Sequence, residues 1–197
     1  MRVTIHQPEH FPYMGLFQKV AAAETFVILD NVNFRKNYFQ NRNKIPLKNG
    51  EDAWITVPVE KKATSKHIKD VQVSQDPTWK RKLLAKIHQN LPVDVEEIYE
   101  GDMLIDINMK SIRWGMDKLK MTQKILFASE LGVEGHKSEL LANILRAVGA
   151  TTYISGPSGK DYLDMSFFEG IDVEFFEPKV DNYYSCLYNL TKEKECH

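Results

Sequence analysis

The chain has 197 residues, which suffices for one domain with a substantial buried core. Its 26 Lys and Arg side chains nearly balance its 27 Asp and Glu side chains, so no global field favours nucleic acid or a membrane surface, and any anion site must be local. No apolar run is long enough to cross a bilayer, and the amino end lacks the layout of a signal peptide. Cys186 and Cys196 lie too late for a disulfide framework, so we expect a reducing, cytoplasmic environment.

The amino-terminal part of the chain has the pattern of a βαβ unit. The β-branched run Val3–Ile5 predicts a short strand, which Pro8 ends because proline lacks the N–H group that an interior strand needs. Apolar residues at helical spacing follow from Met14 to Ala23. The run Thr25–Leu29 is almost wholly apolar and predicts a second strand, which ends at Asp30. Apolar strands on either side of a helix are typical of a parallel sheet covered on both faces.

A basic segment rich in aromatic residues follows from Asn31 to Leu47. Neither helical nor strand periodicity runs through it, so we predict a long loop with at most a short helical turn. Long loops in compact domains are usually functional or disordered, and Phe34, Tyr38 and Phe39 argue against disorder. The sequence therefore predicts a functional loop after the second strand.

The next stretch predicts a β-hairpin inserted beside the parallel core. The turn residues Lys48-Asn49-Gly50 precede the predicted strand Ala53–Val59, on which Pro58 indicates an edge position. Trp54 on this strand is predicted to face the core. The segment Ile68–Val73 alternates as a half-buried strand does and is predicted to pair with it.

Helices and strands alternate through the rest of the chain. Predicted helices run from Asp76, a candidate N-cap, to Asn90, from Leu104 to Met121, from the candidate cap Ser138 to Val148, and from Tyr162 to Glu169. Predicted strands are Lys124–Ala128, Thr151–Ser155 and Asp172–Phe176. No element is predicted after Pro178.

Together these elements predict an α/β fold with a mostly parallel sheet of βαβ units, an inserted β-hairpin and a helical segment. We expect one domain over residues 1–180, with the hairpin and helices at about 51–121 inserted in its core, and a C-terminal tail over 181–197. The pattern does not predict the order of the strands.

His6 and Asp30 are the strongest candidates for catalysis, because both fall at the carboxyl ends of predicted strands, where parallel sheets bind ligands. An imidazole there can take a proton from an attacking amine or hydroxyl, or donate to a phosphate oxygen. Its alternative is a histidine that only bonds loop carbonyls. The carboxylate of Asp30 can orient a substrate amine, hold a divalent ion or fix His6, and its alternative is an Asx turn that closes the strand.

Arg35, Lys36 and Arg42 predict an anion site in the basic segment, because guanidinium groups bind phosphate through paired, charge-assisted hydrogen bonds. The amides of Asn41 and Asn43 suit sugar hydroxyls or the edge of a base. A solvated basic loop is the alternative explanation for this cluster.

Two further features bear on possible binding sites. The turn Gly156–Gly159 can present backbone amides to an anion, with ordinary loop closure as the simpler explanation. No metal site is predicted at His6 and His10, because Pro8 and Pro12 exclude the helix that would bring both rings to one face. Glu9 also occupies the glycine position of the His-x-Gly-His motif of nucleotidylyltransferases, so that class is not favoured.

The sequence resembles one protein family in several long segments that occur in the same order. These segments are HQPEHFPYMGLFQK, FVILDNVNFRKNYFQNRNKI, WITVPV and, more weakly, ATTYISG with Tyr162. The family that they resemble is the WbqC-like family of bacterial proteins. Members occur in surface-polysaccharide (O-antigen) gene clusters, and a glycine-transferase role has been suggested for the family. The resemblance implies that Gln7, Gly156 and Tyr162 border the substrate. This chain departs from the family pattern at His10, where an aromatic residue is expected, and in a shortened segment after Tyr184.

The combined prediction is a group transferase that transfers glycine or another amino acid, with a phosphate-bearing sugar or nucleotide as substrate, in surface-polysaccharide biosynthesis. His6 would act as base, Asp30 would orient the nucleophile, and Arg35, Lys36 and Arg42 would hold phosphate. No cofactor is assigned, and the chemistry is compatible with ATP or another activated donor. One alternative is an amino-acid transferase acting on a modified base in DNA, which the near-zero net charge disfavours. The other is a non-catalytic nucleotide- or sugar-binding module.

Overall fold

The computed structural model describes residues 1–191, and its contacts divide them into two compact units. The first unit contains Met1–Gln7, Gly15–Asn31 and Met121–Lys179. The second contains Pro8–Met14, Val32–Lys120 and residues 180–191. The single domain expected over residues 1–180 remains a prediction, since two compact units can belong to one domain.

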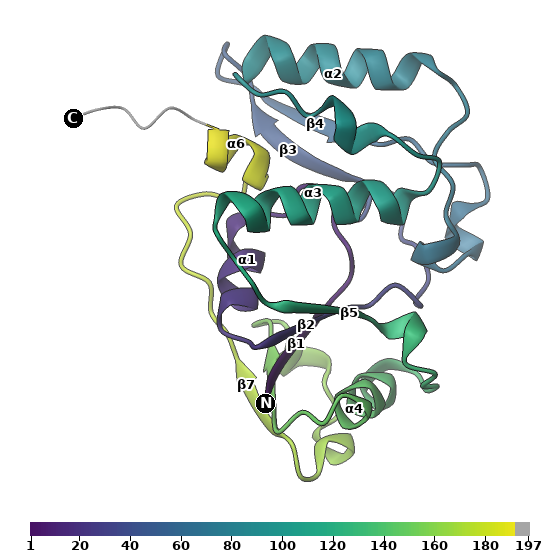
Figure 1. Cartoon of the computed structure of the whole chain (residues 1–197), viewed down its shortest axis with the longest axis vertical. Coiled ribbons are helices and arrows are strands. Elements are labelled where there is room, and N and C mark those ends of the chain that lie inside the picture. Colours follow the sequence, from purple (N-terminus) through teal and green to yellow (C-terminus); the bar gives the residue numbers. More distant parts are fainter. Residues whose placement is uncertain (192–197) are drawn as a thin grey trace. The chain divides into compact units, whose positions relative to one another are not determined.

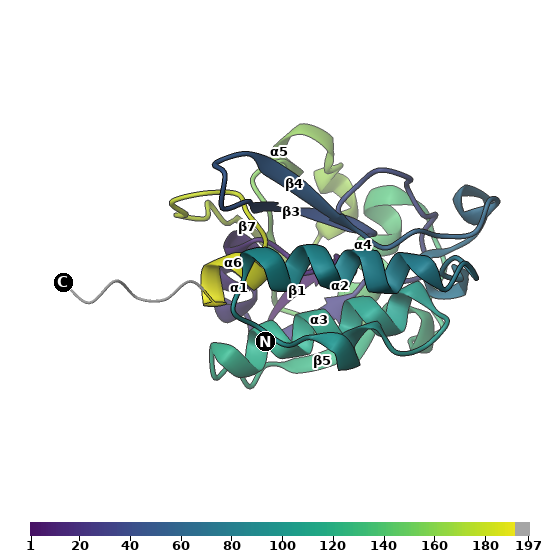
Figure 2. The ribbon, with the colours of Figure 1, turned by 90° about the horizontal axis from the view of Figure 1, so that it is seen from above.

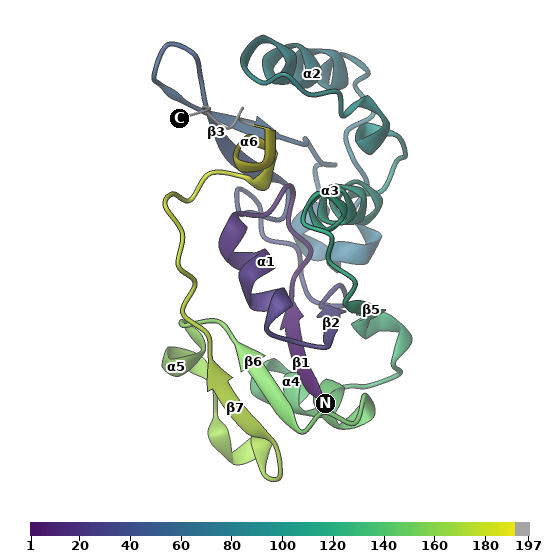
Figure 3. The same cartoon turned by 60° about the vertical axis from the view of Figure 1, so that its left-hand side comes forward.

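The first unit is built on a five-stranded, fully parallel sheet. Its strands are β1 (Arg2–His6), β2 (Thr25–Ile28), β5 (Lys124–Phe127), β6 (Thr152–Ser155) and β7 (Asp172–Phe175). Across the sheet they lie in the order β5-β2-β1-β6-β7 (Figure 3). Parallel strands covered on both faces are apolar, which explains why β2 is buried at every position.

Helices connect these strands. They are α1 (Met14–Ala21), α4 (Lys137–Ala147), α5 (Gly159–Tyr162) and the 3₁₀ helices Ala128–Glu130 and Met165–Phe168. Because connections between parallel strands are right-handed, α1 and α4 lie on opposite faces of the sheet (Figure 3). The buried apolar side chains of this unit include Val3, Ile5, Phe17, Val20, Phe26, Ile144, Leu145 and Ile154.

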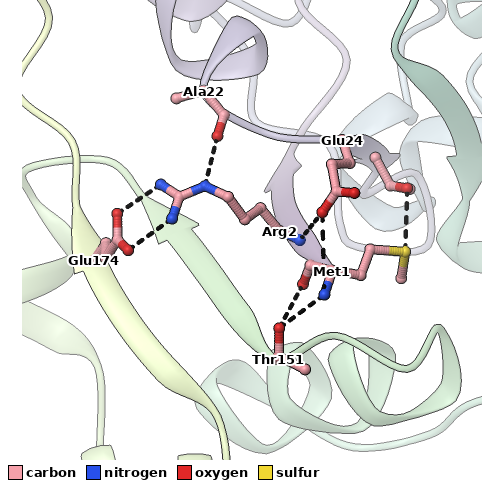
Figure 4. A network of polar contacts seen from close by, with 7 residues as sticks. Met1, Arg2, Ala22, Glu24, Thr151 and Glu174 are labelled. Carbon is pink, nitrogen blue, oxygen red and sulfur yellow. Dashed lines mark hydrogen bonds and ion pairs between the residues drawn. The ribbon is translucent and has the colours of Figure 1, made fainter.

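A polar network joins the elements at the amino end of this sheet (Figure 4). The Arg2 guanidinium donates to both carboxylate oxygens of Glu174 on β7, at 2.8 and 2.7 Å, and its Nε donates to the carbonyl oxygen of Ala22 at 3.0 Å. The N-terminal ammonium of Met1 donates to Thr151 Oγ1 at 2.8 Å. The hydrogen bonds from Arg2 lower the pKa of the Glu174 carboxyl. This network connects β1 with β7, with the end of α1 and with the start of β6.

The second unit combines a small antiparallel sheet with helices. Its elements are β3 (Arg42–Pro46), β4 (Asp52–Thr56), α2 (Thr78–Asn90), α3 (Leu104–Lys118), α6 (Cys186–Thr191) and the 3₁₀ helices Ala63–Ser65, Ile68–Asp70 and Glu96–Tyr99. The helix α2 lies beside β4, and α6 lies beside β3 (Figures 1 and 2). The fully buried side chains here include Phe11, Ile45, Ile55, Ile87, Tyr99, Leu104, Ile107 and Ile112.

The predicted position of the hairpin is wrong. The strand β4 pairs with β3, which lies within the segment predicted to be a loop, and the partner predicted at Ile68–Val73 forms a 3₁₀ helix and an isolated bridge to Val59. On β3, Asn43 and Ile45 are buried whereas Arg42 and Lys44 are not, so the polar Asn43 concealed the alternation of a strand. The Asn49-Gly50 turn between β3 and β4 was the available hairpin signal.

The predicted cap at Ser138 is also wrong. The helix α4 begins at Lys137 with His136 as its N-cap, and Ser138 Oγ instead accepts a hydrogen bond from the backbone N–H of Asp164 at 3.0 Å. The N-cap of α2 is Pro77 and not the predicted Asp76, although Asp76 Oδ1 accepts a hydrogen bond from the backbone N–H of Thr78 at 2.9 Å. The other predicted helices and strands agree with the structure to within a few residues, although the helix predicted over Tyr162–Glu169 is divided into α5 and a 3₁₀ helix. The predicted α/β class, with a mostly parallel sheet and a small hairpin, is confirmed.

Only one of the two cysteines lies within the described residues. Cys186 on α6 is fully buried with a free thiol, and burial raises its pKa far above the usual range. Cys196 lies outside the described residues, as does the last part of the predicted tail.

Candidate functional site

The predicted site residues are divided between the two units. The first unit holds His6, Gln7, Asp30, Gly156 and Tyr162, and the second holds Arg35, Lys36, Asn41, Arg42 and Asn43. Each group is therefore a candidate site of its own unit.

The strand order of the first unit reverses direction between β1 and β6. From β1 the chain proceeds through β2 and β5 on one side, and then through β6 and β7 on the other. Doubly wound sheets bind ligands beyond the carboxyl ends of the strands, beside such a reversal. His6 is the last residue of β1 and Gly156 follows the last residue of β6. The topology thus brings His6, Gln7 and Gly156 to the edge of the sheet where such folds bind ligands.

His6 is half-buried and contacts a buried lysine from α1. The Lys19 side chain is only 6% exposed, and its Nζ lies 3.2 Å from His6 Nδ1 and 3.4 Å from the carbonyl oxygen of Ile5. An ammonium group only donates hydrogen bonds, so His6 Nδ1 accepts when Lys19 is charged. An imidazolium would offer no acceptor and would repel the ammonium. While Lys19 is charged, the contact is a hydrogen bond only to a His6 whose Nδ1 carries no proton.

Asp30 is almost fully buried, at 3% exposure. Its Oδ1 accepts a hydrogen bond from the backbone N–H of Ser129 at 2.9 Å, and its Oδ2 accepts one from Ser129 Oγ at 2.6 Å. Ser129 lies in the 3₁₀ helix that follows β5, the neighbour of β2 in the sheet. The carboxylate thus joins the ends of two adjacent strands, which favours a role in positioning over contact with substrate.

The turn after β6 contains two glycines with opposite surroundings. At Gly156 an added Cβ would meet no atom within 4 Å, whereas at Gly159 it would collide with Ser155 Oγ and lie 3.1 Å from the ring of Phe175. A side chain at position 159 would therefore require Ser155 to rotate and the ring of Phe175 to shift. Gly156 has open space beside it. Tyr162, at the end of α5, is 60% exposed.

In the second unit, the start of the basic segment is ordered by a buried glutamine. Gln40, with no exposed surface, accepts a hydrogen bond through Oε1 from the backbone N–H of Arg35 at 2.7 Å. The guanidinium of Arg35 lies 4.7 Å from the ring centre of Tyr38, and Lys36 is exposed. The segment thus presents two cations and an aromatic face to solvent.

Arg42 is held over an indole ring. Its guanidinium carbon lies 4.1 Å from the ring centre of Trp54, and the Nζ of Lys44 lies 5.2 Å from the same ring. Within residues 1–191, the buried Nε of Arg42 has no hydrogen-bond partner. Ile55 faces the core of this unit and Trp54 does not, so the predicted core position of Trp54 is wrong. Stacking fixes the plane of the guanidinium, and within the described chain the structure gives no hydrogen bond from its two terminal nitrogens, which are the groups that would meet an anion.

The two predicted amides bond to backbone groups. Asn43 Nδ2 donates to the carbonyl oxygen of Phe11 at 2.8 Å, and its Oδ1 accepts from the backbone N–H of Lys44 at 2.8 Å. Asn41 Nδ2 donates to the carbonyl oxygen of Val57 at 3.0 Å. Each bond uses one of the two N–H groups of its amide, and both side chains are buried, so neither amide is exposed to a ligand in solution.

His10 is fully buried in the second unit. Its Nε2 lies 3.1 Å from the hydroxyl oxygen of Tyr99, and its ring meets that of Phe11 edge-on at 5.1 Å. Burial lowers the pKa of His10 to about 3, so the imidazole is neutral at physiological pH. The residue that departs from the family pattern thus fills an aromatic position in the core.

Lys19 is the candidate that sequence reasoning missed. The signal was a lysine beside Val20 and three residues after Leu16, on the face of α1 that is buried.

No group of three or more His, Cys, Asp or Glu side chains within residues 1–191 is arranged to hold a metal ion. No helix in the same part of the chain is both long and apolar enough to span a bilayer.

Comparisons with known proteins identify relatives. The model of the WbqC-like protein family matches residues 7–190. The chain is 27% identical over 195 residues to "Uncharacterized protein Rv1507c" of Mycobacterium tuberculosis (strain ATCC 25618 / H37Rv), covering 92% of this chain and 84% of that protein. No solved structure matches. Since the family model covers most of its length, the chain belongs to the WbqC-like protein family.

Proposed function

We propose that this protein is an amino-acid transferase that acts with glycine and a phosphate-bearing sugar or nucleotide, in surface-polysaccharide biosynthesis. The observation that carries the proposal is His6, which ends β1 beside the reversal of the strand order and contacts the buried Lys19. Glycine as the amino acid comes from the role suggested for the family.

The contact with Lys19 suggests how His6 would act. When Nδ1 accepts from the ammonium of Lys19, a neutral imidazole carries its remaining proton on Nε2. In this state His6 is a hydrogen-bond donor, in contrast to the general base expected from the sequence. A donor placed where negative charge develops stabilises the transition state.

A donor suits both ways in which the amino acid can be transferred. If the glycine carboxyl is activated as an acyl phosphate or adenylate, the acceptor bonds to the carbonyl carbon, the C–O bond to the phosphate breaks, and the acceptor's proton passes to the departing phosphate or to water. If the glycine amine displaces a phosphate from the acceptor, the leaving group is again a phosphate oxygen. In either case His6 Nε2–H would stabilise the oxygen that leaves. ATP is a suitable source of activation in the first scheme.

The other predicted residues enter with narrower roles. Asp30 would position the strand ends through Ser129, and Gln7, Gly156 and Tyr162 would border the substrate at the carboxyl edge of the first sheet. In a separate candidate site of the second unit, Arg35, Lys36 and Arg42 would bind a phosphate group. Asn41 and Asn43 would support that site through their backbone bonds.

The test is a transfer assay with isotopically labelled glycine, ATP and a panel of nucleotide-sugars. Label should move to one acceptor class with the full chain and should fall sharply in His6→Gln. An intact protein that transfers no label under either activation scheme would reject the transferase. Binding of the same ligands without turnover would then indicate a binding module.

Arg42→Ala tests the phosphate role in the same assay. Loss of charge-assisted bonds to phosphate should weaken substrate binding by about 1.5–3 kcal/mol per bond. Arg42→Lys should recover only part of that loss, since an ammonium keeps the charge but not the planar fork. Melting temperatures supply the control, and equal affinity in wild type and Arg42→Ala would remove Arg42 from the site.

A further inference from the structure

A cavity of about 540 Å³ lies between β4 and α2, wholly within the second unit. Its strand side is formed by Trp54, Thr56 and Pro58, and its helix side by Trp79, Lys82 and Lys86. Small-molecule sites typically enclose about 300–1,000 Å³. The cavity is therefore large enough for a ligand of the size of a nucleotide.

The charge at this cavity is positive. Lys82 and Lys86 are separated by one helical turn and share a face of α2. Lys86 Nζ donates to the carbonyl oxygen of Trp54 at 2.9 Å, which fixes the ammonium at the cavity wall. Arg42 stacks over the ring of Trp54. Among the described residues, no ion pair joins any of these three cations to a carboxylate. Lys82 attracts the nearby carboxylate of Asp76 without forming an ion pair, and Arg42 is not itself a lining residue. An anion would therefore find two lining cations, Lys82 and Lys86, that no ion pair within residues 1–191 holds.

The other side chains that line the cavity are mainly apolar or aromatic. The indole N–H of Trp79 donates to the carbonyl oxygen of Ser74 at 3.0 Å, so its polar atom is satisfied and the ring is held in place. The lining residues include no Asp, Glu, Asn or Gln side chain. Thr56 is thus the neutral side chain left to bond hydroxyl groups. A free sugar needs several such partners, whereas the face of a base needs only an aromatic ring.

We propose that this cavity is a nucleotide-binding site, in which the base stacks on Trp79 and the phosphate groups contact Lys82 and Lys86. The site deepens the proposed function by assigning the phosphate-bearing substrate to the nucleotide class, and it rests on that function only for this substrate role. Binding itself requires no transfer reaction.

Isothermal titration of the full chain tests the class of ligand. The probes are ADP, GDP, CDP, UDP and dTDP, with the matching nucleosides, inorganic pyrophosphate and glucose 1-phosphate for comparison. At least one nucleoside diphosphate should bind at least tenfold more tightly than its nucleoside and than pyrophosphate, because both halves of the cavity are then used. Failure of all five diphosphates to bind, equal binding of pyrophosphate, or tighter binding of glucose 1-phosphate would overturn the assignment. Tighter binding of a short oligothymidylate would also overturn it in favour of single-stranded nucleic acid.

Variants on α2 locate the binding. Lys82→Glu and Lys86→Gln should each weaken the diphosphate at least tenfold, because each removes a cation from the wall. Trp79→Leu should weaken the diphosphate but leave the weak binding of pyrophosphate unchanged. Arg81→Glu is the matched control, since Arg81 is an exposed cation on the same helix that does not line the cavity. If Lys82→Glu weakened binding no more than Arg81→Glu does, the site would not be this cavity.

The same variants separate the two proposals. A diphosphate that binds and is sensitive to Lys82→Glu, with no transfer of labelled glycine, would reject the transferase and keep the nucleotide site. Transfer of glycine that persists unchanged in Lys82→Glu and Lys86→Gln, with unchanged substrate affinity, would keep the transferase and reject the site.

Discussion

His6 is half-buried at the end of β1, where Lys19 Nζ lies 3.2 Å from its Nδ1, whereas His10, four residues later, is fully buried against Tyr99 and Phe11. Lys19 gives His6 a neighbour whose ammonium group can donate to Nδ1. The neighbours of His10 are aromatic, and burial lowers its pKa to about 3. Two histidines in one motif thus differ in what surrounds them. One is suited to meet a ligand, and the other is part of the core.

The largest expected effect is on activity at His6. His6→Gln keeps a side-chain N–H donor but cannot hold the same geometry, and loss of one correctly placed donor typically costs about 10²–10³-fold in rate. The melting temperature should change little, because the side chain is only half-buried. The measurement is labelled-glycine transfer beside thermal unfolding. Full activity in His6→Gln would contradict a catalytic role for His6.

The second prediction concerns stability at His10. Its folded pKa of about 3 lies below the ordinary value of 6.5, so the unfolded chain binds the proton more tightly. The stabilisation is complete above about pH 6.5 and is lost as pH falls towards 3, at roughly 1.4 kcal/mol per pH unit, or about 2 kcal/mol by pH 5.

A double variant isolates this contribution. His10→Phe with Tyr99→Phe replaces both polar partners by apolar rings of similar shape, which is nearly neutral for stability. The free energy of unfolding, measured with urea, should fall between pH 7 and pH 5 in the wild type. In the double variant this fall should be smaller by about 2 kcal/mol. Identical drops would mean that His10 is accessible to protons in the folded state.

The two glycines after β6 extend the comparison. Gly159→Ala should destabilise the fold by about 1–3 kcal/mol, because the new methyl group has no space between Ser155 and Phe175. Gly156→Ala should change stability by no more than about 0.5 kcal/mol. If substrate lies at this edge of the sheet, Gly156→Ala should nevertheless lower glycine transfer. Equal destabilisation by the two changes would contradict the packing described for the turn.

The smallest expected effect concerns the neighbour that distinguishes His6. Lys19→Met removes the donor to Nδ1 and should lower transfer about tenfold, which corresponds to about 1.4 kcal/mol. Lys19→Gln retains an N–H donor without the charge and should recover part of the rate. If both variants were equally impaired, the charge of Lys19 and not its hydrogen bond would be the relevant property.

The sequence by itself determined most of the local structure. The apolar run Thr25–Leu29 predicted a buried parallel strand because both faces of that sheet are covered, and β2 is buried throughout. The Leu104–Met121 pattern predicted α3 because apolar residues recur about every 3.6 residues along an amphipathic helix. The chain order also placed His6 at the end of a strand. These features depend on residues close together in the chain.

Tertiary structure decided what lies beside each of these residues. The reversal between β1 and β6 depends on strands far apart in the sequence. The position of Lys19 against His6 depends on how α1 packs back on β1, and the stacking of Arg42 on Trp54 depends on the register of β3 with β4. The sequence predicted that Asn43 binds a ligand, whereas in the structure its amide donates to the carbonyl oxygen of Phe11. Composition and periodicity record which residues are apolar, whereas the neighbours of a polar side chain are fixed only when distant segments meet.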